Sequence, residues 1–87
     1  MKYEEALIDR LMDLMNAEKK IVDRYNNTLV EKRMMFMRGE ACEDPADEFI
    51  YNCQGNDLVR KCDSIKCELN SIRSSIGDVI KQYTEQK

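Results

Sequence analysis

The stretch that decides the fold lies in the second half of the chain, where residues 58–83 read LVRKCDSIKCELNSIRSSIGDVIKQY. Apolar side chains recur there in alternating steps of four and three residues: Leu58, Cys62, Ile65, Leu69, Ile72, Ile76, Val79 and Tyr83. Extended backward, the same spacing reaches Gly55 and Tyr51. This spacing, sustained over several heptads, is typical of a long helix that packs along one side against another helix.

The beginning of this helix is marked by the sequence Asp44-Pro45-Ala46-Asp47-Glu48. An aspartate before the first turn can accept hydrogen bonds from backbone amides that have no partner in the helix. Proline suits the first helical position because its missing N–H would have no partner there. Acidic residues in the first turn favour the positive end of the helix dipole. The sequence therefore predicts a helix from residue 45 to about residue 84.

The first half of the chain predicts another long helix, over residues 4–38, with a broad apolar stripe. The stripe follows steps of three and four residues through Ile8, Leu11, Met15, Glu18, Val22, Tyr25, Leu29, Lys32 and Phe36. Beside it lie Leu7, Leu14, Ile21 and Met35, which widen it. The helix contains neither proline nor glycine before Gly39, and a glycine is common just past a helix end.

Residues 39–44 connect the two helices, and a connection of this length favours an antiparallel helical hairpin as the single domain of residues 1–87. Folding the chain there pairs residues whose numbers sum to about 83. We then expect Tyr25 to lie near Gly55, where a small residue would leave room for the aromatic ring to cross. We also expect Glu18 to lie near Lys66. The alternative is a three-helix bundle with a break at residues 55–57, where Asp57 caps a third helix.

Length and composition indicate that a second chain covers part of the hairpin. The chain has 87 residues, of which 43% are hydrophobic and 36% are charged, so one short chain offers little core. The stripe on the first helix is too broad for one partner helix, and isoleucine at several positions of the second favours higher-order bundles. We therefore expect a homodimer in which two hairpins form a four-helix bundle.

The residue types exclude several classes of chemistry. The chain has no histidine, which removes the commonest general base and metal ligand, so we expect no enzyme, no bound metal and no cofactor. The four cysteines lack the two-residue spacing of zinc or redox motifs. No apolar run is long enough for a membrane span, and no signal peptide is evident, so we expect a cytoplasmic protein with reduced thiols.

The hairpin tip is the candidate binding surface, because helix ends that are apolar all round must be covered. Its residues are Val30, Met34, Met35, Phe36, Met37, Phe49, Ile50 and Tyr51. Methionine suits a docking surface because its side chain is flexible and polarizable. The sequence predicts a non-enzymatic protein-interaction module, such as an adaptor, chaperone, assembly subunit or inhibitor, with a phage or mobile-element origin as one possibility.

The alternative function is a small four-helix nucleic-acid-binding regulator. Its candidate basic strip is Arg24, Lys32, Arg33 and Arg38, with acidic residues interspersed. A net charge of −3 gives no electrostatic reason to expect a nucleic-acid partner.

Overall fold

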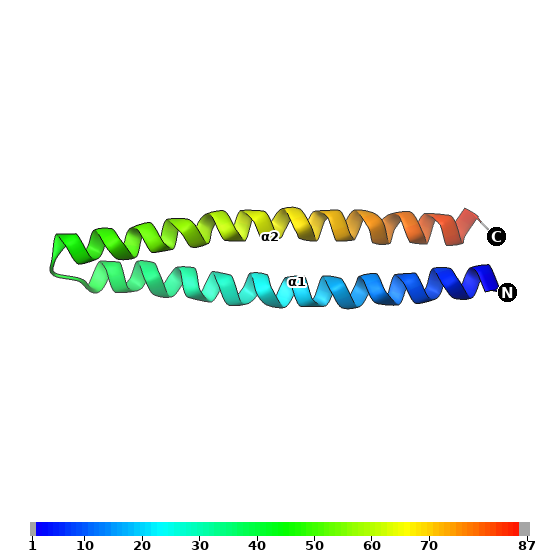
Figure 1. Cartoon of the computed structure of the whole chain (residues 1–87), viewed down its shortest axis with the longest axis horizontal. Coiled ribbons are helices and arrows are strands. Elements are labelled where there is room, and N and C mark those ends of the chain that lie inside the picture. The colour runs from blue at the N-terminus through cyan, green and yellow to red at the C-terminus, as the bar shows by residue number, and fades with distance from the viewer. Residues whose placement is uncertain (1, 86–87) are drawn as a thin grey trace.

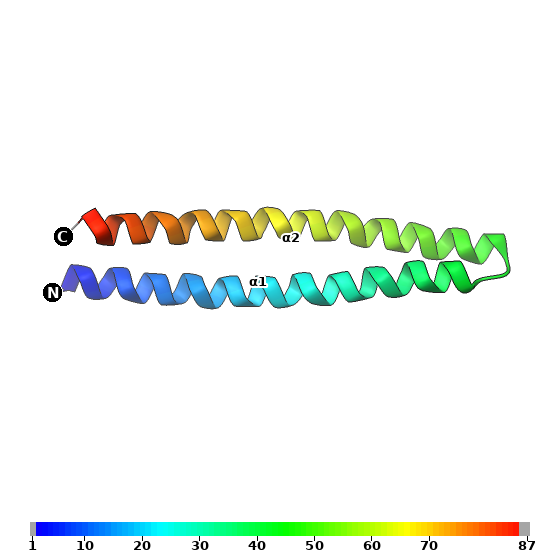
Figure 2. The same cartoon turned by 180° about the vertical axis from the view of Figure 1, so that it is seen from behind.

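The computed structural model describes residues 2–85 and consists of two long helices, α1 (Lys2–Ala41) and α2 (Pro45–Glu85). The helices run antiparallel side by side, so the start of α1 lies beside the end of α2 (Figure 1). Viewed from behind, the same two helices form a single layer (Figure 2). The rod measures 66 × 14 × 12 Å. The predicted all-α antiparallel hairpin is confirmed.

The second helix is continuous through Gly55, so the three-helix alternative with a break at residues 55–57 is wrong. Its N-terminus is capped as the sequence predicted. The Ala46 amide donates to Asp44 Oδ1 at 2.9 Å, and the Glu48 amide donates to the Asp44 carbonyl at 3.0 Å. The first bond satisfies an amide that the first turn leaves free, and the second is the first backbone bond of the helix.

The first helix is longer than predicted and includes Gly39, which has an ordinary helical φ. The glycine therefore lies inside α1, against the first turns of α2, and not just past the helix end. A Cβ at this position would lie 2.8 Å from Asn52 Oδ1 and 3.5 Å from Tyr51 Cβ. Gly39 therefore allows α1 and α2 to approach closely beside the turn, and only residues 42–44 remain to connect them.

The interface between the helices is built from rows of residues with seven-residue spacing. All members of the two α1 rows are buried or half-buried. The rows are Glu4, Leu11, Glu18, Tyr25, Lys32, Gly39 and Leu7, Leu14, Ile21, Thr28, Met35, and the half-buried Cys42 of the connection continues the second. The α2 rows are Gly55, Cys62, Leu69, Ile76, Tyr83 and Tyr51, Leu58, Ile65, Ile72, Val79. Within residues 2–85 the buried apolar core is small and consists of Leu7, Ile21, Cys62, Ile65 and Val79. This alternation is the packing of an antiparallel coiled coil.

The pairing register differs from the prediction. Arg24 Nη2 lies 2.8 Å from Glu68 Oε2, and Arg73 Nε lies 3.0 Å from Glu18 Oε2, so facing residue numbers add to 92 and 91 instead of about 83. Because α1 extends to Ala41, the pivot of the hairpin moves along the chain. The partner of a given α1 residue shifts by about eight residues, roughly 12 Å along α2. Glu18 therefore contacts Arg73, not Lys66.

Candidate protein-binding surface

A close fit between an aromatic ring and a glycine fixes the two helices near the turn. A Cβ at Gly55 would lie 2.7 Å from both Cε1 and Cζ of Phe36. The expectation that an aromatic ring crosses Gly55 is correct in kind, but the ring belongs to Phe36 and not to Tyr25. The new register explains the exchange, because Tyr25 lies beside Lys66, whose Nζ is 5.7 Å from the centroid of the tyrosine ring.

One side of the hairpin, which we call the apolar flank, carries a third row of α1 residues. Its α1 members are Ile8, Met15, Val22, Leu29 and Phe36. The sequence placed this row at the centre of the α1 stripe, whereas the structure places it at the edge of the helix interface. Ile8 is 45% exposed and Met15 is 53% exposed, and the other three members are half-buried. Two α1 rows suffice to cover α2, so the third remains at the side.

Met12 extends the apolar flank, and the sequence analysis missed it. It is exposed, and it lies four residues after Ile8 and three residues before Met15. That spacing places the three side chains together on one helical face. The spacing alone could have identified Met12, but the predicted stripe passes through Leu11 at this point.

The α2 contribution to the apolar flank is apolar near its ends and basic in the middle. Val59 and Ile80 are exposed, and they are separated by Lys66 and Arg73 in a row with seven-residue spacing. Both basic side chains lean across the interface, Lys66 over the Tyr25 ring and Arg73 onto Glu18. Their charged groups are therefore held against α1.

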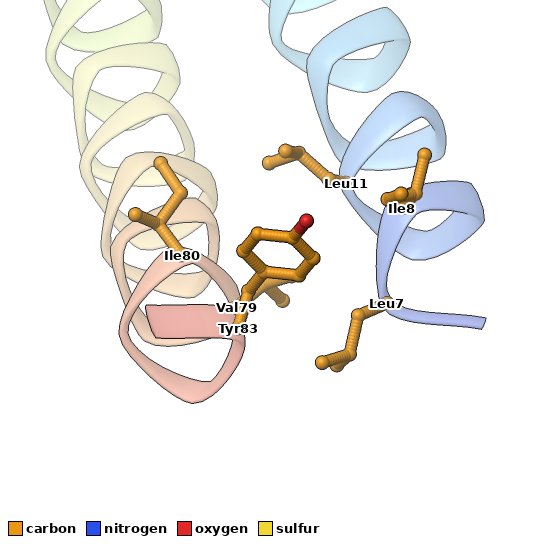
Figure 3. A pocket seen from close by; sticks show the side chains of 6 residues that line it. All are labelled: Leu7, Ile8, Leu11, Val79, Ile80 and Tyr83. Carbon is orange, nitrogen blue, oxygen red and sulfur yellow. The ribbon is translucent and has the colours of Figure 1, made fainter. Parts of the chain in front are cut away.

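A pocket opens on the apolar flank at the end of the hairpin opposite the turn (Figure 3). Its lining is Leu7, Ile8, Leu11, Val79, Ile80 and Tyr83. The cavity has a volume of about 160 Å³. Figure 3 shows the Tyr83 ring between the two helices, with Ile8 and Ile80 on opposite helices beside it. Because Ile8 and Ile80 line the same pocket, their two rows lie on the same flank.

The opposite side of the hairpin, the polar flank, is different in character. Its central contact is the ion pair between Arg24 and Glu68, two half-exposed side chains. The α1 row on this side also contains Arg10, Ala17, Glu31 and Arg38, and the facing α2 row contains Lys61, Glu68 and Ser75. Within residues 2–85, the continuous apolar row therefore lies on the apolar flank and not on the polar flank.

The residues predicted at the tip do not form one surface. Met35, Phe36 and Tyr51 are half-buried between the helices. Val30, Met34 and Met37 are exposed on the outer face of α1, as their spacing of four and three residues requires. Phe49 and Ile50 are exposed on α2, within its first two turns. The tip thus offers separate apolar side chains on two helices instead of one patch.

The basic residues of the alternative function do not share a face either. Arg24 is engaged with Glu68 on the polar flank. Lys32 is half-buried in an interface row. Arg33 lies on one side of that row and Arg24 lies on the other. The structure therefore does not bring these side chains into a single strip.

The cysteines are free thiols in different surroundings. Cys62 is 4% exposed, Cys42 is half-buried in the connection, and Cys53 and Cys67 are exposed on α2. Across residues 2–85, no three potential ligands from cysteine, aspartate, glutamate and histidine gather closely enough to hold a metal ion. Neither described helix contains an apolar stretch sufficient for a membrane span.

Comparison with known proteins gives no relative from which a role could be transferred: no family model, no curated protein and no solved structure matches this chain. The functional argument accordingly rests on the surface of the hairpin.

Proposed function

We propose that the chain is a non-enzymatic protein-interaction module that acts as a homo-oligomer, with two hairpins packed into a four-helix bundle. The apolar flank is its contact surface. Adaptor, chaperone, assembly-subunit and inhibitor roles all use such a module. The absence of histidine from the sequence supports a role in binding instead of catalysis, because it removes the commonest general base.

The observation that carries this proposal is the surplus of exposed surface. The chain exposes 6691 Å², whereas a compact monomer of 10.2 kDa exposes about 5,300 Å² by the usual scaling with mass. The radius of gyration is 19.5 Å, against about 12 Å for a compact domain of this length. The surplus is roughly 1,400 Å², and a standard protein interface buries about 800 Å² on each partner. An interface that removes it would bury about 1,400 Å² on each copy, which is larger than the standard size and within the range of obligate homodimers.

The one-sided distribution of apolar residues supports the apolar flank as that interface. Its α1 row contains no polar member over five successive heptads, while the rows inside the hairpin include Glu18, Thr28 and Lys32. A contiguous apolar row beside a polar rim is characteristic of a protein-binding surface. If no partner covered it, this apolar row would favour nonspecific association with other proteins.

The experiment compares two matched pairs of substitutions on α1. Ile8→Glu with Met15→Glu changes the apolar flank, and Val30→Glu with Met37→Glu changes two somewhat more exposed residues on the outer face. Circular dichroism checks helicity, analytical ultracentrifugation measures self-association, and affinity capture from the native host measures binding to other proteins.

We expect the flank variant to lose association by at least tenfold while the outer-face variant retains it. The proposal fails if the wild-type chain neither self-associates nor captures a protein, or if the two variants lose binding equally.

A further inference from the structure

An exposed aromatic side chain and an apolar pocket lie at opposite ends of the same flank. Phe49 is 68% exposed, the largest exposed fraction among the large apolar residues of the described part of the chain. It belongs to a row with seven-residue spacing that continues through Asn56 and Asp63. On the helix this row lies beside the row of Asn52, Val59 and Lys66. Helical spacing therefore turns Phe49 toward the apolar flank, near the turn. The pocket beside Ile80 lies on that flank at the far end.

We propose that the second copy packs antiparallel to the first along the apolar flank and inserts its Phe49 ring into this pocket. The two-fold axis is perpendicular to the rod, so each copy gives one ring and receives one ring. The inference rests on the proposed homo-oligomeric function and specifies its partner, its orientation and the residue that completes the pocket.

The dimensions of the pocket match a phenyl ring. The cavity holds about 160 Å³ and is lined by apolar side chains from both helices. For comparison, an engineered apolar cavity of about 150 Å³ binds benzene. The lining is supplied by both helices, so a ring seated between Ile8 and Ile80 would contact α1 and α2 together (Figure 3).

The positions along the rod also match. The middle of α2 is residue 65, and Phe49 lies sixteen residues before it while Ile80 lies fifteen residues after it. When two copies pack antiparallel with their α2 midpoints aligned, a residue before the midpoint of one α2 lies beside the residue equally far after the midpoint of the other. Phe49 of one copy therefore reaches Ile80 of the other when the copies overlap along almost their whole length.

Charge favours the same alignment. Placing the axis between Asp63 and Lys66 brings the aspartate of each copy opposite the lysine of the other. In the hairpin register this axis crosses α1 near residue 27, between Val22 and Leu29 of the apolar row. In a parallel arrangement both Phe49 rings would lie at the turn end of the dimer, and both pockets would lie at the opposite end.

The first test measures dimerisation by analytical ultracentrifugation for the wild type, Phe49→Ala and Ile50→Ala. The two residues are adjacent and both exposed, but helical spacing turns Ile50 away from the apolar flank. We expect Phe49→Ala to weaken the dimer at least about 100-fold, because two buried rings are lost, and Ile50→Ala to change it less than about threefold. Circular dichroism confirms that each chain remains helical.

The second test exploits the reciprocity of the contact. Ile80→Glu damages the pocket and leaves Phe49 intact, so it should weaken self-association as Phe49→Ala does. A mixture of the two variants should form a heterodimer at least about tenfold tighter than either homodimer, because one intact ring then meets one intact pocket. This measurement keeps the proposal testable if either variant alone is too weak to characterise.

The outcomes separate this inference from the proposed function. A wild-type dimer that is unaffected by Phe49→Ala, or a mixture that gives no tighter heterodimer, overturns the ring-in-pocket arrangement and leaves an interaction module. A wild-type monomer at 500 µM that still captures a host protein through the apolar flank overturns the second copy as occupant. A monomer that captures nothing overturns both.

Discussion

Replacing Gly55 with alanine tests the closest contact in the hairpin. The added Cβ would lie 2.7 Å from two ring carbons of Phe36, so the ring must withdraw by about 1 Å to reach ordinary contact. Alanine stabilises a helix by about 1 kcal/mol relative to glycine, whereas overpacking an interface costs about 1–3 kcal/mol. We expect a net destabilisation of about 1 kcal/mol, which lowers Tm by about 4–8 °C for a chain of this size.

Gly77→Ala is the matched control, because it makes the same change in the same helix where a Cβ would have no neighbour within 4 Å. We expect it to raise Tm by about 4–8 °C through helix propensity alone. Thermal unfolding by circular dichroism at one protein concentration compares the two. In a Phe36→Leu background, Gly55→Ala should become less harmful, which a double-mutant cycle measures. Equal increases in Tm at Gly55 and Gly77 would refute the close approach of Phe36.

Three further predictions follow from single side chains. Asp44→Ala removes the cap on the first turn of α2 and should lower the urea-unfolding free energy by about 1 kcal/mol, whereas Asp44→Asn should retain most of it. Thr28 is 4% exposed, and its Oγ1 donates to the Arg24 carbonyl of its own helix at 2.8 Å. Thr28→Val should therefore change the unfolding free energy by less than about 1 kcal/mol. A larger loss would mean that the hydroxyl does more than make this bond. Thiol labelling in the native state should modify Cys53 and Cys67 quickly and Cys62 only as the hairpin opens, and mass spectrometry of partly labelled protein checks the order.

The features that were predictable from the sequence are those set by local chemistry. Asp44 and Pro45 identified the start of the second helix because the cap depends on adjacent residues. The continuity of that helix through Gly55 followed from unbroken periodicity. A need for a small residue at position 55 could also be inferred, since a glycine inside a helix is unfavourable unless something crosses it.

The register was not predictable because it depends on where the first helix ends. Gly39 resembles a residue just past a helix end, but it is a helical residue that makes room for Asn52. Periodicity within each helix is unchanged when one helix slides along the other by whole turns. Only contacts between helices, such as Phe36 with Gly55 and Glu18 with Arg73, select one alignment.

The composition of the α1 rows gives a physical reason for the width of its apolar stripe. The rows packed inside the hairpin include Glu18, Thr28 and Lys32, whereas the row from Ile8 to Phe36 is wholly apolar and lies at the side. If the hairpin functioned alone, rotating α1 to bury that row would remove more apolar surface from water, at about 25 cal/mol per Å². The contacts of Phe36 with Gly55 and of Glu18 with Arg73 oppose the rotation. The most apolar row of the helix is thereby held at the edge of the hairpin interface, where a further helix can cover its exposed side.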